Sequence, residues 1–158
     1  MDVWSVFDNG DLFGAVVEAL ADALLSIRPT KIVGVESRGF LLGGAVAARL
    51  GVGFVAVRKQ GALFPGEKAS VVTDSDYRGN RTELRVLVRS VGSHDRVAMV
   101  DDWIEAGAQA RAVRTLVESR GAEFLGLASM VTQCSEATTR AIPVVASLID
   151  GHTLDVSD

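Results

Sequence analysis

The sequence has too few cysteines and histidines for a disulfide or a structural zinc site. It contains one cysteine, Cys134, and 2 histidines, His94 and His152. A single cysteine cannot form an intrachain disulfide, and these residues cannot supply a full tetrahedral set of zinc ligands. This cysteine usage fits a reducing, intracellular compartment best.

Long apolar runs and an excess of positive charge are also missing. No apolar run approaches the roughly 18 residues that a membrane-spanning helix needs. The first residues, MDVWSVFDNGD, lack the basic start and apolar core of a signal peptide. The 16 Lys and Arg against 20 Asp and Glu give a net charge of −4, so no overall basic field attracts nucleic acid. We therefore expect a cytoplasmic protein that binds neither membrane nor nucleic acid.

The composition that remains is typical of one globular domain. The 158 residues are 48% hydrophobic and 23% charged, which is too mixed for a disordered chain. A chain of this length buries roughly two thirds of the surface that its unfolded form exposes. We expect a single domain over residues 1–158, without internal repeats or an interdomain linker.

Helical periodicity and short β-branched runs alternate along the chain and predict an α/β fold. Residues 12–27 carry apolar side chains at helical spacing, after cap candidates within residues 8–11. Gly43 and Gly44 are expected to let a helix over residues 41–50 pack closely on the sheet. Successive strand and helix units indicate a mostly parallel sheet flanked by helices. Strands are predicted over 31–35, 53–57, 83–91, 97–100, 124–131 and 143–149, and another helix from Gly107 to Gly121.

The segment from Gln60 to Asn80 interrupts this pattern. It contains glycines, a proline and charged residues, with a brief apolar interlude at Val71 and Val72. Excursions of this length in a compact domain are usually functional or disordered. We interpret it as a flexible flap, about residues 60–82, with two short strands.

The adjacent carboxylates Asp101 and Asp102 close the apolar run of residues 97–100 and precede the helix after Gly107. In open α/β sheets, ligands bind at the C-terminal ends of strands, where the next helix directs free N–H groups at them. Such a pair can accept hydrogen bonds from vicinal hydroxyls, as on a ribose, or hold a divalent cation. The alternative is a helix cap with a purely structural role.

Three segments follow parallel strands and should meet at one edge of the sheet. They are Glu36 to Gly39, Arg58 to Lys59, and Asp101 to Gln109. The first offers backbone N–H groups and an arginine, and the second adds two cations, a combination suited to an anion. Each basic residue alone is equally a surface ion-pair partner. Together with the two carboxylates they match a ligand with phosphates, hydroxyls and Mg²⁺.

Two long stretches resemble a known family. The run KIVGVESRGFLLGGAVAARLGVGFVAVRKQGALFPGE is similar to the part of adenine phosphoribosyltransferases where an acidic-x-Arg-Gly-Phe turn precedes an Arg-Lys-x-Gly-Lys-Leu-Pro-Gly segment. The stretch RVAMVDDWIEAGAQARAVRTLVESRGAEFLGLASMV resembles the family's phosphoribosyl pyrophosphate motif, and PVVASLI its closing strand. The resemblance begins near Ser5 and implies a type I phosphoribosyltransferase fold, with a flap and a reduced N-terminal hood.

The resemblance also implies roles for individual residues. Asp101 and Asp102 would bind the ribose hydroxyls. Asp76, beside Tyr77 on the flap, joins them as a catalytic candidate. Mg²⁺ would arrive with the pyrophosphate, without a direct protein ligand. The implied pyrophosphate-binding residues are Ser37, Arg38, Gly39, Arg58 and Lys59, and the ribose-phosphate-binding residues are Asp101, Asp102, Glu105, Ala106, Gly107, Ala108 and Gln109.

The chain departs from the family pattern in the loop that holds the 5′-phosphate. The family reads Ala-Thr-Gly-Gly-Thr where residues 105–109 read EAGAQ, so both hydroxyls are lost and Glu105 adds an anion. A carboxylate ~4 Å from a phosphate, at an effective dielectric constant of ~20, would cost on the order of 4 kcal/mol per unit charge. Glu105 escapes this cost if it points to solvent, because such loops bind mostly through backbone N–H groups. The flap lysine is also replaced, by Ala62, and the N-terminus lacks the Phe-Arg-Asp segment that covers the base.

Three functions remain open. The first is a phosphoribosyltransferase that joins a purine-like or other heterocyclic base to the ribose of phosphoribosyl pyrophosphate. The second is a catalytically degenerate protein that binds a nucleotide or sugar phosphate as a sensor or partner subunit. The third is an enzyme whose donor or acceptor is altered at the 5′ position, so that Glu105 or Gln109 hydrogen-bonds a hydroxyl there instead of opposing a phosphate. By resemblance we also expect a homodimer, while Trp103 either walls the site or packs beneath it.

Overall fold

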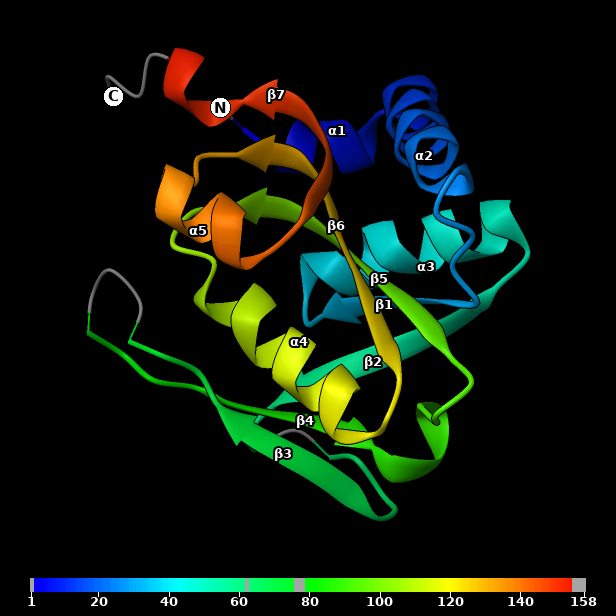
Figure 1. The fold of residues 1–158 in the computed structure, drawn as a ribbon. Coiled ribbons are helices and arrows are strands. Elements are labelled where there is room, and N and C mark those ends of the chain that lie inside the picture. Colours follow the sequence, from blue (N-terminus) through cyan, green and yellow to red (C-terminus); the bar gives the residue numbers. More distant parts are fainter. Residues whose placement is uncertain (1, 62, 76–78, 155–158) are drawn as a thin grey trace.

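A seven-stranded mixed sheet forms the centre of the computed structural model, which describes residues 2–61, 63–75 and 79–154 (Figure 1). The strand order is β3-β4-β2-β1-β5-β6-β7. Pairings among β2, β1, β5, β6 and β7 are parallel, whereas β4 pairs antiparallel with β2 and β3. The predicted α/β fold with a mostly parallel sheet is therefore confirmed. The strands are β1 Lys31–Val35, β2 Gly53–Lys59, β3 Lys68–Val72, β4 Glu83–Leu87, β5 Arg96–Ile104, β6 Glu123–Thr132 and β7 Val144–Asp150.

Helices cover both faces of the sheet. Figure 1 shows α1 (Trp4–Asp8), α2 (Gly10–Leu25) and α3 (Arg38–Leu50) on one face and α4 (Ala108–Ser119) on the other. The short α5 (Glu136–Ala141) lies between β6 and β7 in the chain. The parallel strands are thus enclosed from both sides, as the fold class requires.

Each face of the sheet has its own hydrophobic core, because side chains alternate along a strand. In β1, Val33 and Val35 belong to the core beneath α4, while Ile32 belongs to the core beneath α2 and α3. In β5, Met99 and Val100 divide between the same two cores. This two-sided burial explains why these strands read as nearly continuous apolar runs.

The first predicted helix is confirmed as α2, although it begins at Gly10. The side chain of Asn9 caps it by accepting a hydrogen bond from the Leu12 N–H at 3.0 Å. The sequence patterns did not predict the short helices α1 and α5. Helices this short depend on tertiary packing, which a local pattern does not contain.

Two predictions about the segment after β2 are wrong. Of the described residues between 60 and 80, only β3 is a strand, and it pairs with β4 outside the predicted flap. The strand predicted over 83–91 ends at Leu87 and continues as a 3-10 turn, Val88–Ser90. The reason is pairing: Leu87 lies opposite Lys68, the first residue of β3, so the ladder stops there.

Close packing of α3 on the sheet depends on glycines, but not on both of the predicted ones. A Cβ at Gly43 would lie 3.0 Å from the Phe54 ring, whereas a Cβ at Gly44 would meet nothing within 4 Å. The tightest approach is at Gly34 in β1, where a Cβ would collide with the carbonyl oxygen of Gly39. Gly34 therefore lets the start of α3 lie against β1, and Gly43 lets the middle of α3 pass over Phe54 of β2. The prediction for Gly44 is wrong.

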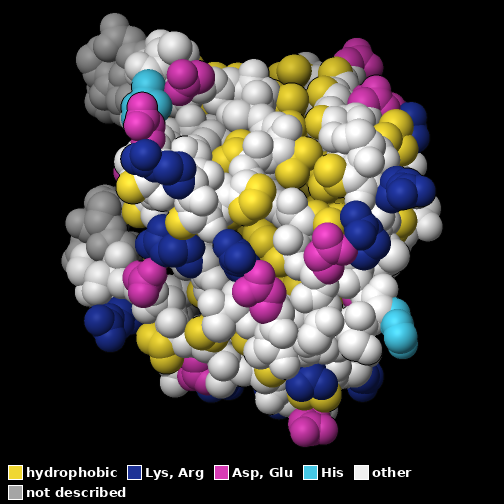
Figure 2. Space-filling view, in the orientation of Figure 1, with side chains coloured by type: hydrophobic (Ala, Val, Ile, Leu, Met, Phe, Trp, Pro, Cys, Tyr) yellow, Lys and Arg dark blue, Asp and Glu magenta, His cyan; other side chains and the backbone are white. Residues whose placement is uncertain are grey.

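The described surface carries mixed charge. On the face shown in Figure 2, Lys and Arg side chains are interspersed with Asp and Glu, without a continuous basic area. No helix within the described ranges has the length and apolar character needed to cross a membrane.

The Gly34 contact predicts the outcome of a matched pair of substitutions. Gly34→Ala should lower the free energy of unfolding by about 1–3 kcal/mol or more, because the new methyl meets backbone that cannot move aside cheaply. Gly44→Ala should leave stability unchanged or raise it by about 0.5–1 kcal/mol, since alanine favours a helix and finds open space. Urea denaturation measures both. Equal stability of the Gly34→Ala variant and the wild type would contradict this packing account.

Candidate active site

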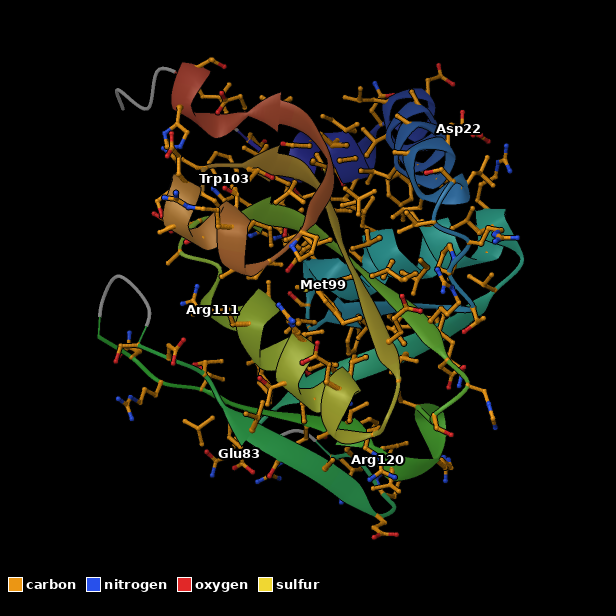
Figure 3. The ribbon with its side chains drawn as sticks, in the orientation of Figure 1. Asp22, Glu83, Met99, Trp103, Arg111 and Arg120 are labelled. Carbon is orange, nitrogen blue, oxygen red and sulfur yellow. The ribbon has the colours of Figure 1, made fainter. Side chains whose placement is uncertain are left out.

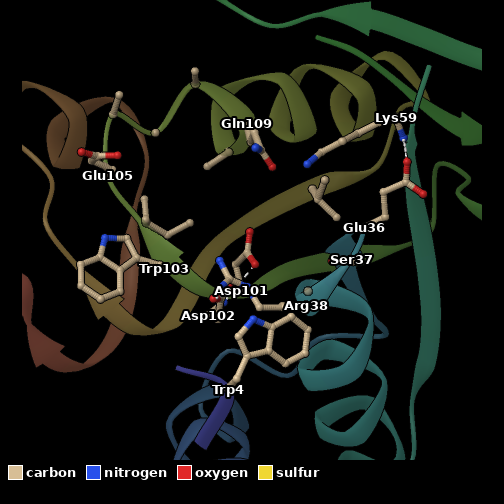
Figure 4. A pocket seen from close by; sticks show the side chains of 17 residues that line it. Trp4, Glu36, Ser37, Arg38, Lys59, Asp101, Asp102, Trp103, Glu105 and Gln109 are labelled. Atoms are coloured by element: carbon tan, nitrogen blue, oxygen red, sulfur yellow. Dashed lines mark hydrogen bonds and ion pairs between the residues drawn. The ribbon is translucent and has the colours of Figure 1, made fainter. Parts of the chain in front are cut away.

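The pocket lies where the chain leaves two neighbouring strands in opposite directions. β1 and β5 are parallel neighbours, but the chain passes from β1 to α3 on one face and from β5 to α4 on the other. Their C-terminal ends therefore border a crevice, the usual ligand position in an open α/β sheet. A pocket of about 450 Å³ occupies this place (Figure 4). It is lined by residues 35–39 and 101–110, with Trp4 and Lys59.

Asp101 and Asp102, near the end of β5, form the buried floor of this pocket. They are only 8% and 4% exposed, and the Asp101 Oδ1 accepts a hydrogen bond from the Asp102 N–H at 3.0 Å. Gly39 lies so near that a Cβ there would be 3.1 Å from the same Oδ1. Burial, followed by the negative charge of Asp102, raises the pKa of Asp101 to about 8. Asp101 therefore carries a proton at neutral pH when no ligand is bound.

Arg38 neutralises the second carboxylate. Its Nε lies 2.8 Å from the Asp102 Oδ2, and its guanidinium carbon is 5.8 Å from the centroid of the Trp4 ring. The Asp102 Oδ2 is buried, and the ion pair with Arg38 balances its charge. The Asp102 carboxylate thus lies in the pocket floor as one half of an ion pair.

Two helices begin at the pocket without a side-chain cap. Ser37 precedes α3 but its hydroxyl accepts no hydrogen bond from the helix, and Gly107, which precedes α4, has no side chain that could. By contrast, Asn9 and Ser135 cap α2 and α5 and do not line the pocket. The first backbone N–H groups of α3 and α4 are therefore available to anions, which the helix dipoles also favour.

Gly107 gives α4 its position beneath the pocket rim. Its φ of +68° is in the left-handed region, and a Cβ there would lie 2.5 Å from the Thr138 Cγ2 of α5. Any other residue would therefore meet both backbone strain and a collision. The N–H of Arg111 bonds to the Gly107 carbonyl at 2.9 Å, which leaves the N–H groups of Ala108, Gln109 and Ala110 without a partner within the helix.

Glu36 separates the two cations at the end of β2. Its carboxylate accepts a hydrogen bond from the Arg58 Nε at 2.8 Å and another from the Lys59 N–H at 2.6 Å. Arg58 also donates to the Leu63 carbonyl at 3.1 Å and lies over the Phe64 ring. Arg58 consequently does not line the pocket, whereas the Lys59 side chain points into it (Figure 4).

Most of the residues singled out from the sequence line this one pocket. Asp76 and Tyr77 lie outside the described residues, and Arg58 is turned away. Glu105 is exposed, and Figure 4 shows it at the opposite end of the pocket from Lys59. The lining residues from the predicted sets are Ser37, Arg38, Gly39, Lys59, Asp101, Asp102, Glu105, Ala106, Gly107, Ala108 and Gln109.

The sequence reasoning missed Trp4. This residue of α1 is 51% exposed and lines the pocket beside Arg38 (Figure 4). The sequence signal that could have identified Trp4 was a large aromatic residue on a short amphipathic segment near the N-terminus. Trp103 lines the pocket and also packs against the core beneath α2 and α3, so both of its interpretations apply. The 2 tryptophans of the chain therefore both line this pocket.

Known proteins share this sequence and architecture. The phosphoribosyl transferase domain family matches residues 4–150. The adenine phosphoribosyltransferase of Carboxydothermus hydrogenoformans is 40% identical over 126 residues, which are 80% of this chain and 72% of the relative. The crystal structure of adenine phosphoribosyltransferase from Thermoanaerobacter pseudethanolicus matches with a TM-score of 0.82 at 33% identity, over 92% of this chain and 84% of that one. The Giardia lamblia enzyme, complexed with 9-deazaadenine, matches with a TM-score of 0.83 at 31% identity, over 96% and 86%.

The raised pKa of Asp101 predicts how stability depends on pH. Its pKa is about 8 in the folded protein, against an ordinary value of 3.8. Between these values the native state binds a proton that the unfolded state has lost, so this group makes stability decline as pH rises. Asp101→Asn cannot ionise, and its free energy of unfolding relative to wild type should be higher at a pH of about 8 than at about 5. Urea denaturation at both pH values tests this, and parallel pH profiles would mean that Asp101 is ionised in the folded protein.

Proposed function

Because the chain belongs to the phosphoribosyltransferase family, we propose that it transfers ribose 5-phosphate from phosphoribosyl pyrophosphate to adenine, forming AMP and pyrophosphate. One observation carries the proposal: the uncapped N-termini of α3 and α4 border the same pocket, with the buried carboxylates Asp101 and Asp102 in its floor. The choice of adenine draws on relatives named adenine phosphoribosyltransferases, at 31–40% identity.

The chemistry of the donor matches this arrangement. Phosphoribosyl pyrophosphate carries a phosphate at one end, a pyrophosphate at the other and two hydroxyls between them. The free N–H groups of Ala108, Gln109 and Ala110 bind the 5′-phosphate at the start of α4. The start of α3 and the ammonium group of Lys59 bind the pyrophosphate. A ligand with a single anionic end would leave one of these helix termini unused.

The carboxylates bind the ribose between the two anionic ends. The Asp102 carboxylate accepts a hydrogen bond from one hydroxyl of the bound donor, and Asp101 faces the other. Arg38 stays beside Asp102, and its positive charge keeps the two carboxylates from repelling the phosphates. The ribose is therefore fixed with its reactive carbon towards the pyrophosphate site.

A divalent cation fits the site as a companion of the pyrophosphate. Over the described ranges, no group of three or more His, Cys, Asp or Glu side chains is arranged to hold a metal ion alone. Mg²⁺ would therefore be held by the oxygens of the pyrophosphate, beside the ribose hydroxyls that Asp101 and Asp102 bind. When bound, Mg²⁺ supplies neutralisation of the pyrophosphate charge.

The reaction breaks one bond and forms another at the same ribose carbon. The bond from C1 to the pyrophosphate oxygen breaks, and its electron pair leaves with the pyrophosphate, which Lys59 and the α3 terminus stabilise. A nitrogen of adenine donates its lone pair to C1, and the proton of that nitrogen passes to the departing pyrophosphate or to water. Trp4 and Trp103 offer aromatic surfaces on which a purine can stack and which keep water from the reacting carbon.

Glu105, which differs from the family pattern, affects the affinity for the donor more than the transfer step. Glu105 is exposed, so water screens its charge from the 5′-phosphate. The hydroxyls missing from residues 106 and 109 do not affect the backbone donors of α4. We therefore favour a transferase. The alternative, a protein that binds without catalysis, would be supported if Glu105 pointed at the phosphate.

Asp102→Asn tests the transferase proposal directly. A hydrogen bond to a charged group contributes about 1.5–3 kcal/mol, so kcat/KM should fall by about 10- to 100-fold. The assay is AMP formation from adenine and phosphoribosyl pyrophosphate, with tryptophan fluorescence reporting donor binding separately. Glu123→Gln, at an exposed ion pair at the other end of the sheet, should retain activity. Donor binding by the wild type without any AMP formation would favour the binding protein, and unchanged activity of Asp102→Asn would refute the ribose assignment.

A second substitution restores the usual character of the phosphate loop. Glu105→Ala with Ala106→Thr should tighten binding of phosphoribosyl pyrophosphate by about fivefold, since a solvent-screened charge at ~4 Å contributes about 1 kcal/mol. Isothermal titration calorimetry measures the change, and Ala106→Thr alone separates the contribution of the hydroxyl. Unchanged or weaker binding would show that Glu105 does not oppose the phosphate.

A further inference from the structure

Arg111 joins two segments that are far apart in the sequence. Its Nε donates to the Asp74 Oδ2 at 2.9 Å, and its Nη1 donates to the Ala106 carbonyl at 2.9 Å. Figure 3 shows Arg111 near the N-terminal end of α4, on the side that faces the hairpin of β3 and β4. One guanidinium therefore contacts both the pocket loop and the segment that follows β3.

Both partners of Arg111 belong to segments whose position matters for the site. Ala106 lies in the loop before α4 and lines the pocket. Asp74 follows Thr73, whose N–H bonds to the Thr82 carbonyl at 2.9 Å and whose hydroxyl accepts from the Thr82 N–H at 3.0 Å. Asp74 is thus fixed to the end of the β3–β4 hairpin.

What distinguishes this arginine is the pair of segments that it joins. Arg111 uses two nitrogens to connect the pocket loop to the segment after β3; its side chain is 34% exposed and that of Asp74 69%. A Cβ at Gly107 would lie 3.4 Å from the Arg111 Nη1, so the guanidinium also packs against the pocket loop. A shift of the loop therefore moves the guanidinium, which is the ion-pair partner of Asp74.

We propose that Arg111 is a positioning residue that couples occupancy of the phosphate loop to the order of the β3–β4 hairpin. This inference rests on the proposed function, because the ligand that fills the loop is the 5′-phosphate of the donor. A phosphate bound to the N–H groups of residues 108–110 fixes the start of α4, and with it the preceding Ala106 carbonyl and the guanidinium that donates to it. The guanidinium then holds Asp74 and the end of the hairpin beside the site.

Hydrogen exchange of the hairpin tests the coupling with ribose 5-phosphate as the probe. Exchange of peptides that include Thr73 and Thr82 is measured by mass spectrometry, with and without the probe. In the wild type, the probe should slow this exchange by about two- to fivefold, the range expected for one ion pair. Pyrophosphate, which lacks the 5′-phosphate, should produce no such slowing.

Four variants separate the coupling from general stability. Arg111→Ala and Asp74→Ala should still bind the probe by calorimetry but lose the slowing, whereas Asp74→Glu should retain it. Arg114→Ala is the matched control, because Arg114 lies on the same helix and also pairs with a carboxylate, Glu118, and a carbonyl, that of Ala141. This control should behave as the wild type.

The outcomes distinguish the coupling from the function on which it rests. If the probe binds and slows exchange equally in the wild type and in Asp74→Ala, the coupling is wrong while the phosphate site stands. If Arg114→Ala loses the slowing as Arg111→Ala does, the effect belongs to the helix and the proposal for Arg111 is overturned. If the wild type does not bind ribose 5-phosphate, the proposed phosphate site fails, and the inference fails with it.

Discussion

The adjacent positions of β1 and β5, with helices leaving on opposite faces, are the constraint on which the rest of the structure depends. This topology brings the ends of two strands and the starts of α3 and α4 to one crevice. The contact between Gly34 and Gly39 holds the start of α3 against β1, and Gly39 in turn leaves room for the Asp101 carboxylate. The position of the anion-binding groups is therefore set by backbone packing.

Local patterns were sufficient for the elements that build this crevice. The apolar run that ends in Asp101 and Asp102, followed by Gly107, predicted the order of β5, the turn and α4 because all three signals lie within a few residues. The predicted strand, 97–100, was too short, since β5 continues through both carboxylates to Ile104. Partners distant in sequence could not be predicted in this way. Arg58 is turned away from the pocket by Glu36, 22 residues earlier. Trp4 reaches the pocket only because α1 packs on α2, a tertiary contact that no local pattern contains.

The proposed function rests on recognition of the 5′-phosphate through the backbone of the loop before α4. The N–H groups at the start of α4 are present whatever the side chains of residues 105, 106 and 109, provided that the glycine before the helix is kept. Gly107 is kept, in a left-handed conformation with α5 packed behind it. In the proposed function, the side chains of this loop adjust the affinity, whereas the buried pair Asp101 and Asp102 and the two helix termini define the kind of ligand.

The central claim is that this pocket binds a ribose with an anion at each end. The most direct measurement is calorimetric titration of the purified protein with phosphoribosyl pyrophosphate, with and without Mg²⁺. The account predicts saturable binding of one donor per chain that strengthens when Mg²⁺ is present, and weaker binding of ribose 5-phosphate, which leaves the α3 terminus empty. Absence of donor binding in the presence of Mg²⁺, or equal affinity for the two ligands, would contradict it.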